Sequence, residues 1–337
     1  MPKLYGKDQP QGFTNRIEKV AIVGAGGQIG RFFTEALLKT GKHIVTAITR
    51  ANSTTKLPAG VKSAVVDYDD EQSLVTALEG QQFLIITISL TASPDTQSKL
   101  IRAAAKAGVA YVMPNWHGVD PQNEDMLREC PVPPERRTGP AEIKALGVSS
   151  SVVLSCGFWY EYSLAAGPDT FGIDIKNRGI TWIDSGSTRI NVTSWPQCGR
   201  AVAALLGLKE LPEDEDDKSP SLSQFRDSVV YISSFRISQR DMFESVKRVT
   251  GTGDADWKMT HESSKERWKQ GIEALKRGDI MTGFLKQLYS RVLFPNGGGD
   301  YEAKRELRNE LLGLPKEDLD ALTSVAVRAA GTGKFEY

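Results

Sequence analysis

The glycine-rich segment GAGGQIG, residues 24–30, constrains this chain more than any other feature. It directly follows the apolar run Lys19–Val23 and directly precedes an amphipathic stretch of helical period. Glycines at such spacing permit a tight turn, a close approach of backbone to a diphosphate, and close packing of helix on strand. Free N–H groups of the first helical turn would hold the phosphates. The predicted cofactor-binding residues here are Gly24, Gly27, Gln28, Ile29 and Gly30. The alternative is a turn that only joins a strand to a helix.

Short apolar runs alternate with helix-length amphipathic stretches as far as Cys156. This alternation is typical of βαβ units around a parallel sheet, and apolar strands fit a sheet covered on both faces. The predicted strands are Lys19–Val23, His43–Thr49, Ser63–Val66, Phe83–Ser89, Ala110–Met113 and Ser151–Cys156. The predicted helices between them are Arg31–Thr40, Glu71–Glu79 and Asp95–Ala107, each followed by or ending near a glycine. The sequence therefore predicts an α/β fold with a doubly wound parallel sheet, a Rossmann domain.

The alternation fades after Gly157, which predicts a second, smaller and mainly helical substrate lobe. We expect residues 1–16 to be a flexible N-terminal segment, residues 17–157 to be the Rossmann domain, and residues 158–337 to form the second lobe. Residues 194–208 read as a helix and residues 228–235 as a strand that return to the sheet domain. The second lobe is then discontinuous in sequence.

Composition limits the classes of partner. Lys plus Arg and Asp plus Glu number 42 each, so no net charge attracts the chain to nucleic acid or to an anionic membrane. The three cysteines are widely separated and only three histidines are present, which favours free thiols over a metal site. No apolar run has the length of a signal sequence or a membrane span, so we expect a cytoplasmic protein. The oligomeric state stays open, and a homodimer is one possibility.

Arg50, at the end of the second predicted strand, bears on the choice between NAD and NADP. An acidic residue at this place would bind the ribose 2′-hydroxyl, whereas a guanidinium suits a 2′-phosphate. The sequence therefore favours NADP(H), with a surface arginine as the alternative. Asp67 follows the third strand, and Thr87 and Ser89 follow the fourth. Ligands of open α/β sheets bind at the carboxyl ends of the strands, which makes these residues cofactor-binding candidates. A loop-capping role is the alternative for Asp67.

With these residues in view, the chain resembles the NmrA-like and isoflavone-reductase-like group of atypical short-chain dehydrogenases. The resemblance spans most of the chain and rests on segments in a shared order: KVAIVGAGGQIGR, AVVDYDDEQSLVTALEGQQFLIITIS, TQSKLIRAAAKAGVAYVMPNWHG and LSCGFWYEYSL, and more weakly CGRAVAALLGL and VVYISSFRISQRDMF. The pair PNWHGVDP and CGFWYEYSL resembles a fungal branch linked to specialised metabolism. The resemblance implies NADPH preference and a substrate cleft between two lobes. Such families contain reductases of aromatic compounds and also non-catalytic NADP sensors.

The usual proton donors of the resembled enzymes are missing. No Tyr-x-x-x-Lys pair is present. Isoflavone-type reductases use a lysine at the start of the helix before the sixth strand, and the matching place here holds Arg136. An arginine does not donate a proton at neutral pH, although it polarises a carbonyl or binds an anion. Lys144, further along that helix, is a second candidate, with a solvated surface lysine as the alternative.

His117, after the fifth strand, is the leading candidate for proton transfer because imidazole titrates near neutral pH. A structural histidine bonded to backbone is the alternative. Asn115 is a candidate for orienting the nicotinamide, and Trp116 for contacting substrate. Both could instead pack the loop.

An aromatic segment follows the sixth strand. Phe158, Trp159 and Tyr162 are predicted to contact an apolar substrate, and Tyr160 to supply a hydrogen bond or a proton. Packing between the lobes is the alternative reading for this segment. The sequence favours an NADP(H)-dependent oxidoreductase acting on an apolar aromatic or heterocyclic small molecule. A variant of this expectation is a biosynthetic step coupled to rearrangement or cyclisation. The competing hypothesis is a non-catalytic NADP(H) sensor that regulates a protein partner.

Overall fold

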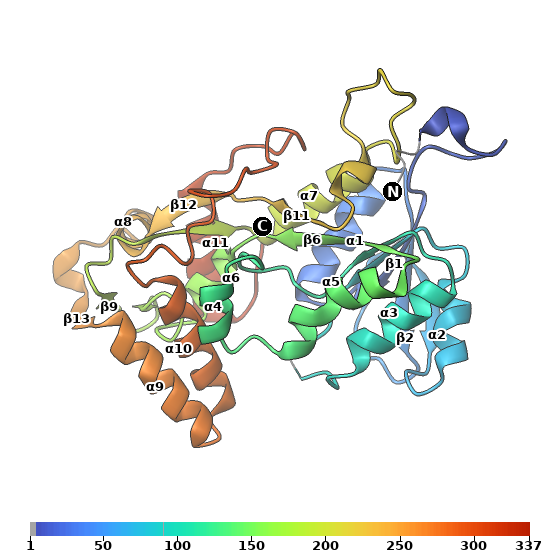
Figure 1. The fold of residues 1–337 in the computed structure, drawn as a ribbon. Coiled ribbons are helices and arrows are strands. Elements are labelled where there is room, and N and C mark those ends of the chain that lie inside the picture. The colour runs from blue at the N-terminus through green and yellow to red at the C-terminus, as the bar shows by residue number, and fades with distance from the viewer. Residues whose placement is uncertain (1–4, 90) are drawn as a thin grey trace.

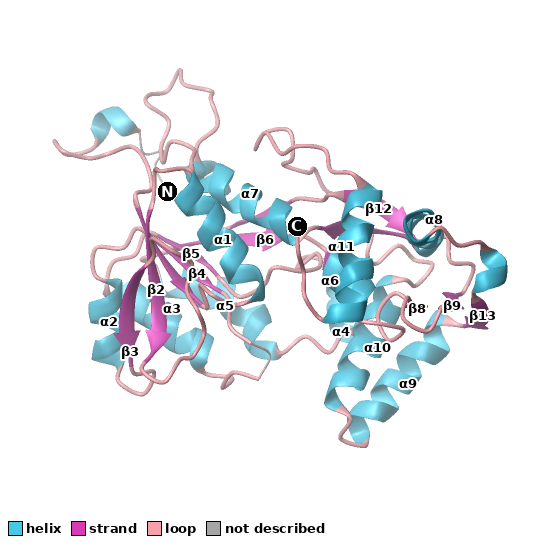
Figure 2. Cartoon of the chain, turned by 180° about the vertical axis from the view of Figure 1, so that it is seen from behind, coloured by secondary structure: helices cyan, strands magenta, loops and turns pink. Residues whose placement is uncertain are grey.

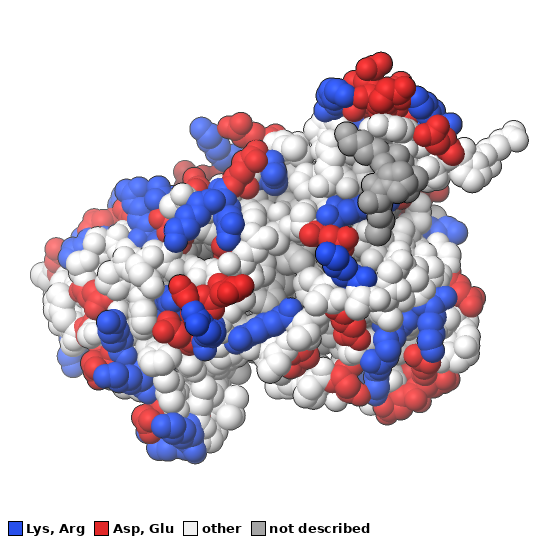
Figure 3. All heavy atoms as spheres, viewed as in Figure 1, with Lys and Arg blue, Asp and Glu red and all other residues white. Residues whose placement is uncertain are grey.

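The computed structural model describes residues 5–89 and 91–337. A parallel sheet with helices on both faces forms one end of the molecule, and helices with two small sheets form the other (Figure 1). In the described part of the chain, no helix combines the length and apolar character needed to cross a membrane. Positive and negative side chains are interspersed over both ends of the face in Figure 3, as the zero net charge leads one to expect.

The central sheet has seven strands, and every neighbouring pair is parallel. In spatial order they are β11 (Ser228–Tyr231), β6 (Ser150–Ser155), β5 (Tyr111–Met113), β4 (Phe83–Ile86), β1 (Lys19–Val23), β2 (Ile44–Arg50) and β3 (Lys62–Val66). The prediction of a doubly wound parallel Rossmann sheet is confirmed. The six predicted strands are present with ends shifted by up to three residues, and β11 adds a seventh by pairing with β6.

Helices cover both faces of this sheet because its strands are apolar on both sides. Along β1, Val20 and Ile22 belong to one buried cluster, and Ala21 and Val23 to another. The first face is covered by α1 (Gln28–Lys39) and α7 (Trp195–Leu206), which lie side by side (Figure 2). The second face is covered by α2 (Glu71–Leu78), α3 (Thr96–Lys106) and α5 (Pro134–Leu146).

The second lobe combines six helices with two three-stranded sheets among its described residues. One sheet has the order β12 (Phe235–Ser238), β10 (Arg189–Thr193), β7 (Phe158–Trp159), and the other β13 (Lys258–Glu262), β9 (Gly179–Ile183), β8 (Ile173–Asp174). The helices are α4 (Glu124–Glu129), α6 (Tyr160–Ala165), α8 (Gln239–Thr250), α9 (Ser264–Lys276), α10 (Ile280–Val292) and α11 (Leu319–Thr332). Helix α4 lies within the range 17–157 that was expected to be the Rossmann domain, but its Met126 packs in the core of the second lobe. The predicted helical character of the C-terminal region is confirmed, and the two small sheets add to it.

The chain passes from the central sheet into the second lobe at Gly157. This residue has φ +63°, and a Cβ there would lie 2.1 Å from the backbone oxygen of Asn191. Only glycine fits such a left-handed position beside another strand. The transition therefore holds β7, and the aromatic segment that follows, close to the carboxyl end of β6.

The N-terminal segment that was expected to be flexible lies partly outside the described residues, since residues 1–4 are not described. The described part includes a short 3-10 helix, Gly6–Asp8, which contacts the acidic loop after α7, residues 213–217. The N–H of Gly6 donates to the Pro212 oxygen at 2.7 Å, and Nδ2 of Asn15 donates to the Leu211 oxygen at 2.9 Å. In this structure residues 5–16 therefore lie against the acidic loop.

Candidate functional site

The turn between β1 and α1 has the geometry of a diphosphate cradle. Gly24 has φ +77°, and a Cβ on it would lie 2.1 Å from the Thr87 backbone oxygen. A Cβ on Gly30 would lie 2.1 Å from the Gly24 oxygen, so the helix packs against the turn through a bare backbone. Helix α1 starts after Gly27, and no side chain caps its first N–H groups. These groups remain available to bind phosphate oxygens.

Arg50 ends β2 with an exposed side chain. Among the ion pairs formed by residues 5–89 and 91–337, none involves Arg50. Its charge acts on Tyr68 nearby: burial raises the pKa of the Tyr68 phenol, and Arg50 opposes that rise. An unpaired guanidinium at the carboxyl end of β2 suits a 2′-phosphate. Asp67 is exposed, and its Oδ1 accepts the Asp69 N–H at 2.9 Å, which corresponds to the loop-capping alternative.

A cavity of about 540 Å³ lies where the two lobes meet. From the Rossmann lobe it is lined by the start of α1 and by loops after β4 and β5, and from the other lobe by the aromatic segment and α10. The predicted residues that it brings together are Gly27, Gln28, Ile29, Gly30, Thr87, Ser89, Asn115, Trp116, His117, Arg136, Phe158, Trp159 and Tyr162. The predicted residues outside this lining are Gly24, Arg50, Asp67, Lys144 and Tyr160.

Helix α10 contributes a wall of the cavity that sequence reasoning missed. Its lining residues are Met281, Phe284, Leu285, Leu288 and Tyr289. They recur at helical spacing within the region that was predicted only to be mainly helical, and that spacing was the available signal. The loop before α5 adds Val132 and Pro133. Most of the wall facing the nucleotide turn is therefore apolar.

The loops after β4 and β5 hold the polar side chains of the cavity in place. Nδ2 of Asn115 donates to the Ile88 oxygen at 3.0 Å, and the Asn115 N–H donates to Oε1 of Gln97 at 2.8 Å. Nε1 of Trp116 donates to the Val119 oxygen at 2.7 Å. Strand β4 ends at Ile86, earlier than predicted, so that residues 87–89 form irregular backbone at the cavity.

His117 lies at the cavity in an unusual backbone conformation, with φ +37°. Its ring is buried, and Nε2 carries the proton because it lies 2.9 Å from the Ile86 carbonyl oxygen, which can only accept. Burial lowers the pKa of His117 to about 4, so the ring is neutral at pH 7. Nδ1 is buried without a partner among the described residues. This arrangement corresponds to the structural alternative, a histidine bonded to backbone.

Tyr160 does not reach the cavity. Its side chain is fully buried, and its hydroxyl lies 2.7 Å from Oγ1 of Thr323, which also accepts a hydrogen bond from Ser245. Burial raises the pKa of the phenol far above neutrality. Tyr160 therefore joins α6 to α11 and α8, and a role in proton transfer conflicts with this position. Lys144 is exposed on α5 outside the cavity, as the surface alternative described.

Replacing Tyr160 by phenylalanine is expected to leave kcat and KM within about twofold of wild type, because the hydroxyl contacts no cavity residue. Stability should fall by about 1–2 kcal/mol, since Thr323 loses a buried partner. Urea unfolding and steady-state turnover measure the two effects. A large loss of kcat with unchanged stability would return Tyr160 to the catalytic candidates.

The other aromatic residues after β6 both line the cavity and pack between the lobes. Tyr162 lies 5.4 Å from Trp195, and Trp159 lies 5.9 Å from the same ring, measured between ring centroids. Phe158 lies 4.4 Å from Tyr289 of α10. These three residues line the cavity and also pack against neighbouring rings, so the packing alternative holds, while contact with a substrate stays a prediction.

A buried carboxyl lies behind this wall. Glu161 is fully buried, and its Oε1 accepts the Trp195 N–H at 2.8 Å and the hydroxyl of Tyr337. Burial raises the pKa of Glu161 to about 7, and the carboxylate of Glu317 adds to the rise. The folded protein therefore binds a proton on the Glu161 carboxyl more tightly than the unfolded chain does. As a result, the contribution of Glu161 to the stability of the fold decreases as the pH rises from 4.5 through 7.

Above pH 7, replacing Glu161 by glutamine should make the protein about 3 kcal/mol more stable than wild type. At pH 4.5 the two proteins should be almost equally stable. The quantity to compare is the difference in free energy of unfolding between the variant and wild type. Burial lowers the pKa of His117 to about 4 from 6.5, which makes both proteins more stable as the pH rises, and this shared contribution cancels in the difference. Urea unfolding across this pH range measures it. A difference that does not vary with pH would contradict the buried, protonated state of Glu161.

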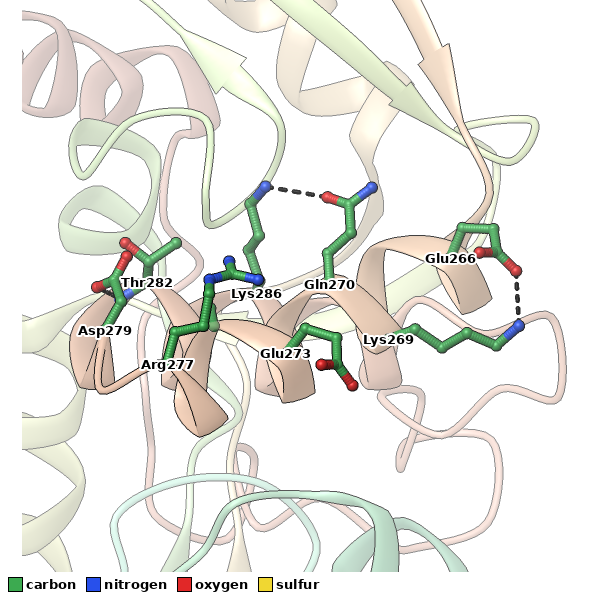
Figure 4. Close-up of a pocket in the computed structure, with 9 residues that line it drawn as sticks. Glu266, Lys269, Gln270, Glu273, Arg277, Asp279, Thr282 and Lys286 are labelled. Atoms are coloured by element: carbon green, nitrogen blue, oxygen red, sulfur yellow. Dashed lines mark hydrogen bonds and ion pairs between the residues drawn. The ribbon is translucent and has the colours of Figure 1, made fainter.

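A second hollow, of about 440 Å³, runs along α9 and α10 (Figure 4). Its lining contains none of the predicted site residues. Lys269 pairs with Glu266 at 2.8 Å, and Lys286 donates to Gln270 at 3.2 Å. Because this hollow lies apart from the β1–α1 turn and from every predicted site residue, we place the functional site at the cavity between the lobes.

Comparisons with known proteins agree with this fold. The model of the NmrA-like family matches residues 16–134. Oxidoreductase aprR of Aspergillus flavus is 27% identical over 304 residues, which cover 90% of this chain and 96% of the relative. Quinone oxidoreductase 2 of Escherichia coli is 35% identical over 98 residues, which cover 28% of this chain and 34% of the relative.

Solved structures of similar fold span nearly the whole chain. Isoflavone reductase has a TM-score of 0.68 at 20% identity, covering 90% of this chain and 97% of that one. AtPrR2 with NADP+ and (+)-pinoresinol has a TM-score of 0.68 at 17% identity, covering 93% and 100%. The Escherichia coli quinone oxidoreductase QOR2 in complex with NADPH has a TM-score of 0.61 at 19% identity, covering 90% and 98%.

The parallel seven-stranded sheet with helices on both faces is a Rossmann-type fold, and the curated relatives that match this chain are oxidoreductases. Over residues 16–134 the chain is similar to the NmrA-like family, and along most of its length it is similar to oxidoreductase aprR.

Proposed function

We propose that this protein is an NADP(H)-dependent oxidoreductase that transfers a hydride between the nicotinamide and an apolar aromatic or heterocyclic small molecule. The observation that carries the proposal is the single cavity that joins the diphosphate turn to a wall of aromatic and aliphatic side chains. Related structures that bind NADP+ or NADPH, including one with the aromatic compound pinoresinol, support the choice of cofactor and substrate class.

The residues present fit NADP(H). The N–H groups at the start of α1 would bind the diphosphate, since Gly24 and Gly30 leave no Cβ in the way. Arg50 would pair with the 2′-phosphate, and Asn115, held on the Ile88 oxygen, would border the nicotinamide. The cofactor supplies the hydride chemistry, while the chain orients the partners and excludes water.

The substrate half of the cavity would hold a flat molecule. Phe284 and Leu288 of α10 line the side contributed by the second lobe, and Trp116 and Tyr162 lie on the other described walls. A volume of about 540 Å³ is in the range of sites for drug-sized ligands. In reduction, the hydride adds to one atom of an electrophilic C=C, C=N or C=O bond and a proton adds to the other. Such a step would serve as a tailoring reaction in specialised metabolism, including one followed by rearrangement or cyclisation.

NADPH consumption with a panel of aromatic enones, quinones and imines tests the proposal. Turnover is expected with at least one compound, and Phe284→Ala should raise its KM by about tenfold because a buried phenyl contact is lost. Ile280→Ala is the matched control, because Ile280 lies on the same helix, is 64% exposed and does not line the cavity. Equal effects of the two variants would place the substrate elsewhere.

A non-catalytic NADP(H) sensor is the second candidate function. Two observations favour it. His117 is neutral and its N–H donates to a backbone carbonyl, and Arg136 stands where the resembled reductases have a proton-donating lysine. Tight NADPH binding, no turnover across the panel and purification with one specific protein would support the sensor.

A further inference from the structure

Arg136 is the only charged side chain among the described residues that line the cavity. It lies in the first turn of α5, and the cavity around it is bordered by Val132, Pro133 and Trp116. A positive charge in an apolar surrounding is costly unless an opposite charge or several hydrogen bonds accompany it.

The protein itself supplies little compensation for this charge. Among the described residues, no carboxylate lies within ion-pair distance of Arg136. The one hydrogen bond of its side chain in the described part of the chain is long, 3.4 Å from Nη2 to the Ile88 oxygen, and Asn115 donates to the same oxygen. Burial lowers the pKa of Arg136, and the Glu135 charge opposes that change. Since arginine begins above 12, the group stays charged at neutral pH.

The charge of the cofactor is accounted for elsewhere. The diphosphate has the N–H groups at the start of α1, and the 2′-phosphate has Arg50 at the end of β2. Arg136 instead follows the loop of Val132 and Pro133, and its charge lowers the pKa of His117, beyond the carboxyl ends of β4 and β5. The free guanidinium N–H groups therefore belong to the substrate half of the cavity.

We propose that Arg136 binds an anionic oxygen group on the substrate, so that the natural substrate is a flat apolar molecule bearing a carboxylate. This inference rests on the proposed function and narrows its substrate class. A guanidinium presents its N–H groups as a fork that matches two carboxylate oxygens, and such charge-assisted pairs are stronger than neutral ones. The same charge disfavours cationic molecules, including iminium compounds.

The test compares three probes of one shape, 2-naphthoate, 2-naphthamide and 2-naphthylmethylammonium, by calorimetric titration of the full chain with and without saturating NADP+. We expect naphthoate to bind about 10- to 100-fold more tightly than the amide, and the ammonium compound more weakly than either. Arg136→Gln should remove the preference for naphthoate and leave amide binding within about threefold. Arg136→Lys should keep part of it.

The matched control is Arg137→Gln. Arg137 is the next residue in the helix, is exposed, lies outside the cavity lining and donates to the Cys130 oxygen. It should preserve the full preference for naphthoate. Equal binding of naphthoate and amide to wild type would overturn the proposal. The proposal would also be overturned if Arg136→Gln lost affinity for NADP+ but still preferred naphthoate to naphthamide, because the guanidinium would then bind the cofactor. Failure of wild type to bind NADP+ at all would be a separate result, against the proposed function.

Discussion

Replacing Gly30 by alanine is expected to abolish NADP(H) binding, with a loss of at least about 100-fold in affinity, and to destabilise the fold. The added Cβ would lie 2.1 Å from the Gly24 backbone oxygen and 2.7 Å from Oγ1 of Thr87. Neither α1 nor the turn can withdraw without moving the N–H groups that would hold the diphosphate. Overpacking of this kind costs roughly 1–3 kcal/mol and occasionally more. NADPH titration and urea unfolding of the same preparation measure both effects.

Gly331→Ala is the matched control, because Gly331 lies within α11 and its Cβ would meet open space. That variant should bind NADPH normally and be as stable as wild type or more stable by up to about 1 kcal/mol. A Gly30→Ala protein that binds NADPH as tightly as wild type would show that the β1–α1 turn does not carry the cofactor.

Replacing Arg50 by glutamate is expected to reverse the cofactor preference. The guanidinium contributes about 1.5–3 kcal/mol with a 2′-phosphate, and a carboxylate there would accept the ribose 2′-hydroxyl of NAD instead. The lost contact to the 2′-phosphate and the gained contact to the 2′-hydroxyl together should shift the ratio of the NADP+ and NAD+ dissociation constants by roughly 100- to 10,000-fold. Titration of each variant with both nucleotides measures the ratio.

Two further variants separate the contact to the 2′-phosphate from the contact to the 2′-hydroxyl and from a general effect of charge. Arg50→Gln should weaken NADP+ and leave NAD+ unchanged, because it removes the phosphate contact and adds no strong acceptor for the 2′-hydroxyl. Lys42→Glu reverses a charge on an exposed residue before the opposite end of β2 and should change neither affinity. An unchanged ratio in Arg50→Glu would mean that the 2′-phosphate is bound by other residues.

The parts of the structure set by local sequence were predictable. The turn at residues 24–30 has the predicted order of strand, turn and helix, because the glycines, the apolar strand and the amphipathic helix are contiguous. Of the strand predicted over residues 228–235, residues 228–231 join the central sheet as β11, whereas Phe235 begins β12 of another sheet. Arg136, which the resemblance places where isoflavone-type reductases have a lysine, lines the cavity, and its role stays a prediction.

The parts set by packing between distant segments were not predictable. Tyr160 and Tyr162 are two positions apart on α6, and such positions point to different sides of a helix. Nothing in the sequence said which would face the cavity, and the structure places Tyr162 there and Tyr160 against Thr323 of α11. The wall formed by α10 is more than a hundred residues from the nucleotide turn, so no local pattern joined the two.

The central claim is that the β1–α1 turn binds NADP(H). The most direct test is titration of the full chain with NADPH, in which fluorescence energy transfer from the tryptophans to the nicotinamide is the measured signal. The account predicts saturable binding with a dissociation constant in the micromolar range, weaker binding of NADH, and loss of the signal in Gly30→Ala. The absence of any response to NADPH at millimolar concentration, from protein shown to be folded, would contradict it.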